Sequence, residues 1–359
     1  MKMTQLTVRQ EHFAVVVIGR NEGERLVRCF GSVAALRAPR ELKLQCVVYV
    51  DSNSSDNSLE AAQAMGAHTL ALKDGPWTAA RARNAGWRAA VAECSAEAIE
   101  LDWILFLDGD TRVDPEFVCA ARLAAADDDT IASITGQRRE ANPRQSIYTR
   151  VLDLDWGSPP GEAAFFGGDT FLRLAALAAT DGFDDRLIAG EEPELSRRMR
   201  ALGWRHQSIA VPMTTHDLAI RRFSQYWARL RRAGYAYAEV SERFRYTSDP
   251  LWLSRSRRNI ARAAFWSFSA LLALVAALSP GLGFSWLRAV AALGLWALLL
   301  TAFALRSAWL NRRKSRSLAT LLLYGFHSHL QQLPVLLGQI AYRMDKMSAK
   351  RRGLIEYKL

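Results

Sequence analysis

Short apolar segments alternate with helical patterns in the N-terminal half of the chain, and this alternation limits the possible folds most strongly. The apolar runs at 13–18, 44–50 and 103–107 are continuous, as in strands buried on both faces. Helical patterns follow at 24–36, 58–65 and 78–93, and a weaker strand is expected at 68–72. Such alternation predicts a Rossmann-like α/β domain, with a mostly parallel sheet, flanking helices and a ligand edge at the strands' carboxyl ends.

Composition changes sharply after Arg262, and we predict a boundary between a domain at 1–245 and a membrane-associated α-helical region at 246–359. Hydrophobic helices are expected at about 263–279 and 286–306, separated by Pro280-Gly281-Leu282-Gly283. An uncharged stretch of 17 residues rises about 26 Å, close to the roughly 30 Å of a bilayer core. The preferred interpretation is a membrane-spanning hairpin, and the alternative is a re-entrant or interfacial pair. A third stretch, at 318–342, is diluted by polar residues and is predicted to lie at the interface or to fold back.

The formal charge of +11 comes largely from arginine clusters that flank the hydrophobic segments. This placement favours membrane lipids as partners, and not nucleic acid. The N-terminus lacks the apolar stretch of a signal peptide, so the first domain is expected on the cytoplasmic side of the inner (cytoplasmic) membrane. The cysteines lack metal-binding spacing and are expected to be reduced. His327 and His329 have such spacing, but no carboxylate accompanies them in their apolar segment.

Asp108-Gly109-Asp110 directly follows the buried strand at 103–107. Two carboxylates at the carboxyl end of a central strand can bind Mg²⁺ or Mn²⁺, which prefer oxygen ligands. The alternative is an ordinary turn, because Asp-Gly is common in turns.

Several motifs in order resemble the family 2 glycosyltransferases: Val15–Glu22, Val50–Asp56, Ala82–Gly86, Asp108–Asp110, Gly182–Asp184 and Gly190–Glu192. The resemblance covers about residues 13–245 and implies a GT-A fold. It also implies inverting transfer from a nucleoside diphosphate sugar, a UDP-sugar by default, with a divalent cation (Mn²⁺ or Mg²⁺) bridging the diphosphate and the two aspartates.

The resemblance implies a role for each matching residue. Asn21, Glu22, Asp51, Arg83 and Asp108 would bind the donor nucleotide; the alternative for Arg83 is a place on a solvated helix face. Asp108, Asp110 and His216 would bind the metal, and Asp169 would contact the acceptor or the sugar. Glu192 would be the general base. The family often has Glu-Asp where this chain has Glu191-Glu192, so Glu191 could share that role. The alternative is that both only cap a helix.

The expected protein is a membrane-attached hexosyltransferase of cell-envelope or polysaccharide biosynthesis. The basic aromatic segment at 221–235 is expected to lie near lipid headgroups and to bring a lipid-linked acceptor to the site. Two alternatives stay open at this stage. One is a non-catalytic membrane scaffold with the same fold. The other is a haloacid-dehalogenase-type phosphatase, because Asp108 to Thr111 resembles its DxDxT pattern, in which the threonine comes one position later.

Overall fold

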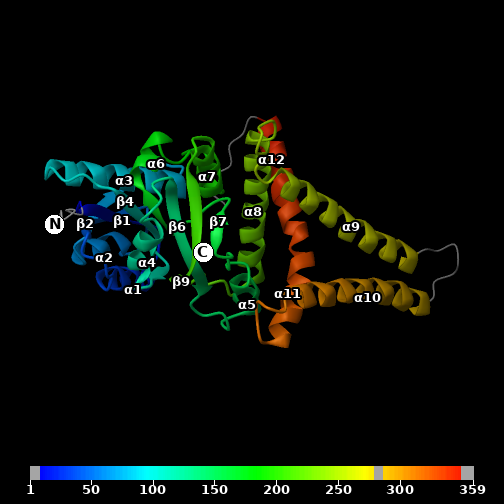
Figure 1. The fold of residues 1–359 in the computed structure, drawn as a ribbon. Helices are drawn as coiled ribbons and strands as arrows, with labels where there is room; N and C mark the ends of the chain where they lie inside the picture. The colour runs from blue at the N-terminus through cyan, green and yellow to red at the C-terminus, as the bar shows by residue number, and fades with distance from the viewer. Residues whose placement is uncertain (1–8, 279–285, 349–359) are drawn as a thin grey trace, which may run out of the picture. The chain divides into compact units, whose positions relative to one another are not determined.

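The computed structural model describes residues 9–278 and 286–348. The chain divides into two compact units, which we call the sheet unit and the helical unit. The sheet unit comprises Met1–Ala141 and Trp156–Leu218, and the helical unit comprises Asn142–Asp155 and Ala219–Leu359. Figure 1 identifies the elements of both. The predicted loop at 280–283, Ser279 at the end of the first hydrophobic segment, most of the N-terminal segment and the basic residues 350–352 lie outside the described residues.

The strands of the described residues form one mixed sheet in the order β3-β2-β1-β4-β8-β6-β9-β5, with β7 paired to β9. Their bounds are β1 Glu11–Gly19, β2 Leu42–Asp51, β3 His68–Ala71, β4 Trp103–Asp108, β5 Thr111–Val113, β6 Ile131–Glu140, β7 Gly161–Ala163, β8 Thr170–Arg173 and β9 Arg205–His216. β1 to β4 pair in parallel, as predicted. β8 runs antiparallel to both its neighbours, β4 and β6. The sheet is therefore mixed rather than mostly parallel.

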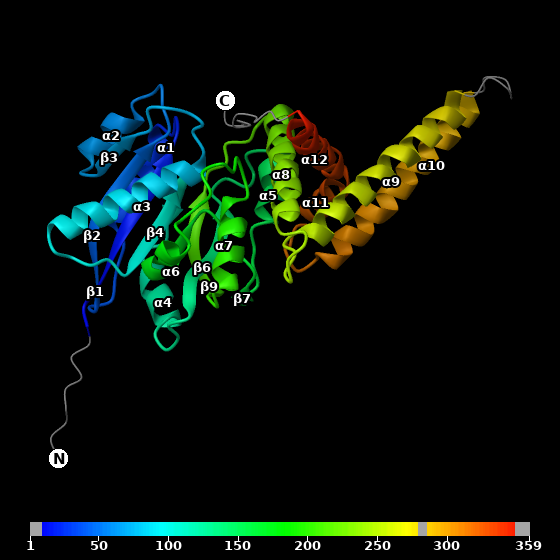
Figure 2. The same cartoon turned by 90° about the horizontal axis from the view of Figure 1, so that it is seen from above.

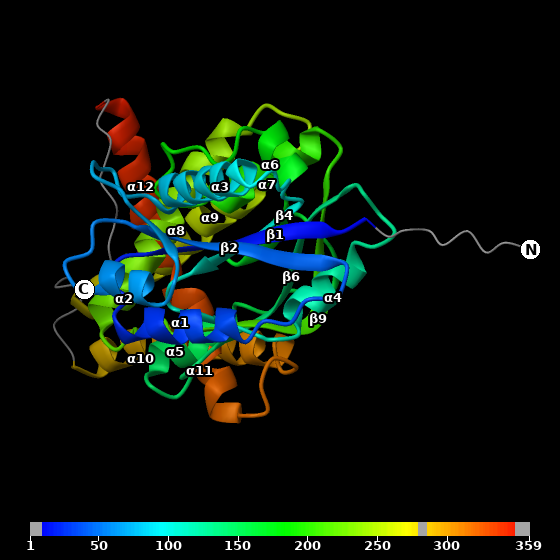
Figure 3. The ribbon, with the colours of Figure 1, turned by 90° about the vertical axis from the view of Figure 1, so that its left-hand side faces the viewer.

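Helices cover both faces of this sheet, as Figure 3 shows along the strands. One face of β1 packs through Phe13, Val15 and Val17 against α1 (Glu24–Ala34) and α4 (Phe117–Ala124). The alternate residues of β1 pack on the other face against α3 (Ala79–Ala96), α6 (Leu174–Ala179) and α7 (Glu191–Ala201). Side chains alternate across a strand, so a strand buried on both faces reads as an unbroken apolar run. A short helix, α2 (Ser58–Ala64), completes the unit.

The helical unit contains α5 (Ile147–Asp153), α8 (Phe223–Arg243), α9 (Leu253–Leu278), α10 (Trp286–Leu310), α11 (Leu318–Leu330) and α12 (Gln332–Met347). α9 and α10 contact each other. They overlap in the view of Figure 2, and Figure 1 shows them diverging toward α12 and α11. Both are long and apolar enough to cross a membrane, by length and composition. The predicted third stretch is two helices, because the helix breaks at Gln331.

Glycines allow α8 and α12 to touch through their backbones. A Cβ on Gly234 of α8 would lie 2.0 Å from the carbonyl oxygen of Val335, and one on Gly338 of α12 would lie 2.0 Å from that of Arg231. Small residues at both crossing points permit such close helix packing. α8, the basic aromatic helix of the sequence analysis, therefore packs on α12 within the helical unit.

Candidate active site

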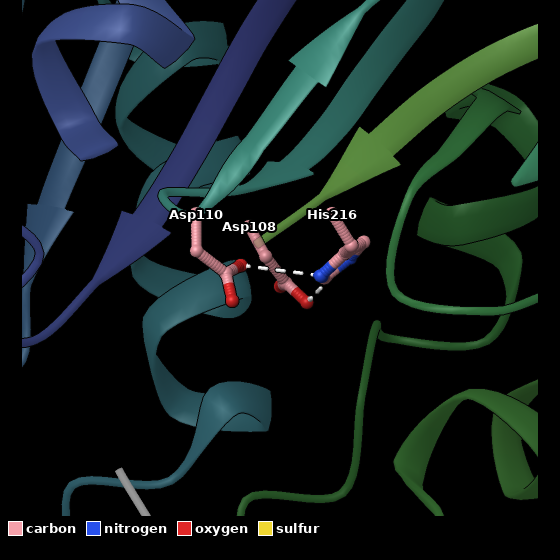
Figure 4. Close-up of side chains that lie close together, drawn as sticks. All are labelled: Asp108, Asp110 and His216. Carbon is pink, nitrogen blue, oxygen red and sulfur yellow. Dashed lines mark ion pairs between the residues drawn. The ribbon is translucent and has the colours of Figure 1, made fainter. Parts of the chain in front are cut away.

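Three predicted metal ligands meet at the carboxyl ends of β4 and β9. Asp108 ends β4, Asp110 follows it, and His216 ends β9. Figure 4 shows the three side chains converging from these elements. His216 Nδ1 lies 3.4 Å from Asp110 Oδ1, and His216 Nε2 lies 3.9 Å from Asp108 Oδ2. One ligand atom from each lies within 4.8 Å of the others, so small side-chain rotations would bring them onto one cation.

The donor set fits a divalent cation, because two carboxylates and an imidazole suit Mn²⁺ and, through the carboxylates, Mg²⁺. The local charge fits as well. Burial by itself lowers the pKa of His216, but Asp110 and Asp169 outweigh burial and raise that pKa to about 10. The surrounding carboxylates thus favour positive charge where a metal would bind.

Asp169 lies beneath this cluster with no exposed surface. Its carboxylate accepts hydrogen bonds from the Asp108 backbone N–H at 3.1 Å and the Thr214 hydroxyl at 2.7 Å, and it lies 3.2 Å from His216 Nε2. Burial alone raises the pKa of Asp169, but His216, Arg138 and the Thr214 hydroxyl hold that pKa below the ordinary value. In this structure Asp169 thus contacts Asp108, Thr214 and His216. Its predicted contact with the acceptor or the sugar stays a prediction.

Trp156 is a site residue that sequence reasoning missed. Its ring packs edge-on against the His216 imidazole, with ring centroids 5.0 Å apart. No motif marks Trp156, since it precedes a Gly-Ser-Pro-Pro loop. Only the return of β9 to the strand carboxyl ends brings His216 to this tryptophan.

Arg83 connects the metal cluster to the acidic pair. It comes from α3, which Thr78 caps by accepting a hydrogen bond from the Arg81 N–H. The guanidinium is buried and donates from Nη2 to Asp108 Oδ1 at 2.9 Å and from Nη1 to Glu191 Oε1 at 3.0 Å. Nη1 also lies 3.2 Å from Glu192 Oε1. Arg83 thus does not lie on a solvated helix face, and it brings Asp108, Glu191 and Glu192 into one site.

Glu191 and Glu192 differ in their surroundings at the start of α7. The Gly190 N-cap has a left-handed backbone with φ of 84°, which suits glycine. The Glu191 side chain is 5% exposed, and that of Glu192 is 17% exposed. Burial and the neighbouring Glu191 raise the pKa of Glu192 to about 7, although Arg83 opposes them. Glu192 is therefore the more accessible carboxylate and is poised to exchange a proton near neutral pH.

Gly168 lies close to Arg83, Asp108 and Glu192. A Cβ at this position would lie 2.7 Å from Arg83 Nη2, 3.0 Å from Asp108 Oδ2 and 3.3 Å from Glu192 Oε1. A larger residue would therefore separate Arg83 from its carboxylate partners.

The predicted nucleotide-binding residues lie at the ends of β1 and β2. Asp51 Oδ1 accepts hydrogen bonds from the Tyr49 and Ser54 hydroxyls, and Oδ2 accepts one from the Ser54 N–H. Asn21 has a left-handed backbone with φ of 54°, and its side-chain oxygen accepts a hydrogen bond from the Ser55 N–H at 2.7 Å. The loop between β2 and α2 thus holds the side-chain oxygens of Asn21 and Asp51 in place.

Glu22 lies between this loop and the metal cluster. Its Cγ would lie 3.0 Å from a Cβ on Gly19 and 3.1 Å from one on Gly109. Glu22 also forms an ion pair of 3.0 Å with Arg25. The glycine between the two aspartates thus makes room for Glu22 beside the metal ligands.

Asn84, next to Arg83, holds the loop at 182–185. Its amide nitrogen donates to the Phe183 carbonyl and the Asp185 carboxylate, both at 2.7 Å, and its oxygen accepts from the Phe183 N–H. Gly182 has φ of 74°, and a Cβ there would collide with the Asn84 side-chain oxygen at 2.4 Å. The pattern of Ala82 to Gly86 and the Gly182 motif therefore meet in space.

His327 and His329 take no part in the metal cluster found among the described residues. No carboxylate lies in the apolar segment of these histidines, but His327 Nε2 lies 3.2 Å from Asp155 Oδ2. Asp155 is distant in sequence, so local sequence could not reveal it. His329 Nε2 lies 2.9 Å from the Ser307 hydroxyl.

A family model described as Glycosyl transferase family 2 matches residues 14–228, more than half of the chain. Among solved structures, the mannosyltransferase PcManGT from Pyrobaculum calidifontis, in complex with GDP-Man and Mn²⁺, aligns with a TM-score of 0.62 at 17% identity. The alignment covers 95% of this chain and 89% of that chain. Residues 1–349 of S. aureus TarS with UDP-GlcNAc align with a TM-score of 0.44 at 16% identity, covering 93% and 92%.

A search of curated proteins found no match. The family match and the GT-A fold confirm the predicted glycosyltransferase. A haloacid-dehalogenase-type phosphatase would have its motif on the first strand, whereas Asp108 ends β4. Across the matched residues, the ordered motifs meet at one sheet edge beside a group suited to a divalent cation. The chain belongs to glycosyl transferase family 2.

Proposed function

We propose that the protein transfers a sugar from a nucleoside diphosphate sugar to an acceptor hydroxyl, with inversion and with a divalent cation. The observation that carries the proposal is the placement of Arg83, which contacts the metal-site carboxylate Asp108 and the acidic pair Glu191-Glu192 together. Such a site presents a place for the leaving diphosphate beside a base for the incoming hydroxyl.

Asp108, Asp110 and His216 are the residues that would hold the cation. When bound, Mn²⁺ or Mg²⁺ stabilises the charge that develops on a leaving diphosphate. The structural neighbour PcManGT was solved with GDP-Man and Mn²⁺, which supports this class of donor and cation. A UDP-sugar stays our default donor. Asp169 is proposed as the residue that orients His216, because it accepts hydrogen bonds from neighbouring groups and is wholly buried.

Glu192 is proposed as the general base. Its carboxylate takes the proton of the acceptor hydroxyl while that oxygen bonds to the anomeric carbon and the bond from this carbon to the diphosphate oxygen breaks. The greater exposure of Glu192 and its raised pKa support Glu192 over Glu191. Glu191 instead holds Arg83 in place.

Asn21, Glu22 and Asp51 are proposed to bind the nucleoside. They lie at the carboxyl ends of β1 and β2, where open α/β sheets bind ligands. Asp51 could accept hydrogen bonds from ribose hydroxyls or a base edge. Arg83 and Asp108, at the neighbouring strand end, would then meet the diphosphate.

The helical unit is proposed to attach the enzyme to a membrane, with α9 and α10 crossing it as a hairpin. α9 rises about 39 Å over its 26 residues, more than the roughly 30 Å hydrocarbon core. Its first turns carry Arg255, Arg257, Arg258 and Arg262, and Arg312 and Arg313 follow α10. This charge placement supports a cytoplasmic orientation for both ends at the inner membrane. A lipid-linked acceptor of envelope or polysaccharide biosynthesis fits such an attachment.

Release of nucleoside diphosphate from a panel of sugar nucleotides, by detergent-purified protein with Mn²⁺ or Mg²⁺ and a membrane lipid extract, tests the proposal. We expect metal-dependent release with one donor. Glu192→Gln should lower kcat by about a thousandfold, since general bases contribute roughly 10² to 10⁴. Asp110→Ala, which removes a proposed metal ligand, should abolish the metal-dependent release. Glu60→Gln, on the exposed surface of α2, is the matched control. If no donor reacts and no nucleotide binds with metal, the non-catalytic scaffold is the better account.

A further inference from the structure

Arg138 extends from β6 at the same sheet edge as the candidate active site. β6 runs parallel to β9, and Arg138 pairs with Thr214, close to the proposed metal ligand His216. The guanidinium lies against the backbone of Gly167, because a Cβ on this glycine would lie 2.7 Å from Nη1 and 2.9 Å from Cζ and Nη2 of Arg138. The glycine therefore leaves room for a guanidinium at the carboxyl ends of the strands.

Arg138 differs from Arg83 in its partners. Arg83 is buried, and it forms ion pairs with Asp108, Glu191 and Glu192. Arg138 is half-buried, and its guanidinium forms no ion pair and no hydrogen bond in the described part of the chain. A partly desolvated charge without a partner is unfavourable. The guanidinium of Arg138 is therefore suited to an anion that comes from outside the protein.

Asp169 does not use the donors of Arg138. The charge of Arg138 helps to lower the pKa of this carboxylate, so the two groups lie within electrostatic reach of each other. The carboxylate oxygens have other partners, because Oδ1 accepts from the Asp108 N–H and Oδ2 contacts the Thr214 hydroxyl and His216 Nε2. A guanidinium offers a fork of N–H donors, and those of Arg138 stay available to a substrate.

The order of the strands places Arg138 on the acceptor side of the metal cluster. The proposed nucleoside-binding residues lie at the ends of β1 and β2, whereas β6 lies beyond β4 and β8 in the sheet. Gly168 follows Gly167, and a Cβ on Gly168 would lie 3.3 Å from Oε1 of the proposed base Glu192. Adjacent Cα atoms are about 3.8 Å apart, so one acceptor molecule can reach both Glu192 and Arg138.

We propose that Arg138 binds a phosphate group of the acceptor, so that the sugar is transferred to a hydroxyl of a phosphate-bearing molecule. The inference rests on the sugar transfer proposed above and narrows the class of its acceptor. A guanidinium binds phosphate through paired hydrogen bonds, which orient the ligand as well as hold it. The phosphate itself is unchanged in the reaction, and the acceptor hydroxyl reacts as described above. A lipid-linked sugar phosphate and a soluble sugar phosphate both offer this chemistry.

Chemical labelling of arginine tests the anion site without donor, metal or turnover. The full-length, detergent-purified protein is treated with phenylglyoxal in sodium phosphate or in sodium chloride of equal ionic strength, and peptide mass spectrometry identifies the modified arginines. We expect phosphate to slow the labelling of Arg138 several-fold and to leave that of Arg139 unchanged. Arg139 is the internal control, because it is exposed and successive strand residues point to opposite faces. Equal labelling rates of Arg138 in the two salts, or no labelling of Arg138 in chloride, overturn the inference.

Turnover of the donor that the panel identifies tests the class of acceptor. A membrane lipid extract is separated by anion exchange into neutral and acidic lipids, and a deproteinised cytosolic extract supplies soluble anions. We expect release of nucleoside diphosphate with one of the acidic fractions and not with the neutral lipids. Release with the acidic lipids assigns the phosphate to a lipid-linked acceptor, and release with the soluble anions assigns it to a sugar phosphate. Neutral lipids that support release as well as either acidic fraction overturn the inference.

Substitutions connect the acceptor to Arg138. In Arg138→Gln, the amount of the active fraction needed for half-maximal release should rise about ten- to a hundredfold, because charge-assisted hydrogen bonds are lost. KM for the donor should not change. Arg138→Lys keeps the charge and should lose less, and Gly167→Ala, which drives a Cβ into the guanidinium, should weaken acceptor use in the same direction. Arg139→Gln is the matched control and should behave like the wild type. Folded Arg138→Gln with wild-type acceptor dependence, or with a change in donor KM alone, overturns the inference.

Two results separate this inference from the proposed function. If phosphate protects Arg138 but no sugar nucleotide is turned over, the proposed transfer fails and the anion site at Arg138 stands. If a donor is turned over, but phosphate does not protect Arg138 and Arg138→Gln uses the acceptor like the wild type, the transfer stands and the assignment of the acceptor fails.

Discussion

The sheet unit and the α9–α10 pair of the helical unit place the same kinds of side chain in opposite ways. Leu105 and Leu107 of β4 have no exposed surface, whereas Leu271 of α9 and Leu298 of α10 are 54% and 65% exposed. The placement of charged side chains differs too, because the sheet unit buries Arg83 among carboxylates. In water a folded chain buries its apolar surface, and a buried charge needs partners. The two regions are therefore suited to different solvents, and the sheet unit buries the charged groups of the candidate active site.

The largest expected effect concerns the proposed crossing of the membrane by α9 and α10. In the double variant Leu271→Arg/Leu298→Arg, two arginines at the bilayer centre cost roughly 5 to 7 kcal/mol together. We expect the protein to leave the membrane fraction after an alkaline carbonate wash. Leu123→Arg is the control, because Leu123 is 77% exposed on α4 of the sheet unit. Retention of the double variant in washed membranes would contradict a spanning hairpin.

A single methyl group should disturb the charge network of the sheet unit. Gly168→Ala places a Cβ against Arg83, Asp108 and Glu192, and a displacement near 1 Å costs about a hundredfold in rate. We expect kcat/KM for the identified donor to fall by about a hundredfold with membrane association unchanged. Gly31→Ala on α1 is the control, since no atom lies within 4 Å of its Cβ. Equal rates for both variants would show that the site tolerates displacement of Arg83.

A glycine-to-alanine substitution in the helical unit should lower the thermal stability of the protein. Gly234→Ala drives a Cβ into the backbone carbonyl of Val335, and such overpacking typically costs about 1 to 3 kcal/mol. We expect a lower thermal midpoint in detergent with unchanged Mn²⁺ affinity. Gly294→Ala in α10 meets no atom within 4 Å and should be neutral or slightly stabilising. Similar midpoints for the two variants would mean that α8 and α12 separate without cost.

The smallest effect concerns pH. Burial and Glu191 raise the pKa of Glu192 to about 7, and a general base acts only when ionised. At saturating Mn²⁺, kcat/KM should therefore be level above this pKa and fall about tenfold per pH unit below it. The residual activity of Glu192→Gln should lack this acidic limb. A profile that is level from about pH 5 to pH 8 would assign the base elsewhere.

Local patterns were sufficient for the elements that carry the site. The apolar runs ending at Ile18, Val50 and Leu107 are β1, β2 and β4, whose parallel pairing places their polar ends at one edge. Local sequence patterns did not predict contacts between residues that are distant in the chain. Trp156 beside His216, Asp155 beside His327 and the burial of Arg83 all join residues from different elements.

By itself the sequence determined the family, the alternation of strands and helices and the two long apolar helices, because these follow from periodicity and from motifs whose order lies along the chain. Only the tertiary structure decided that Asp169 is buried beneath the metal ligands, that Arg83 joins Asp108 to the acidic pair, and that Glu192 is more exposed than Glu191. Burial and charge pairing depend on which segments meet in space. Such meetings arise from packing and β-sheet pairing across long sequence separations, which local sequence does not encode.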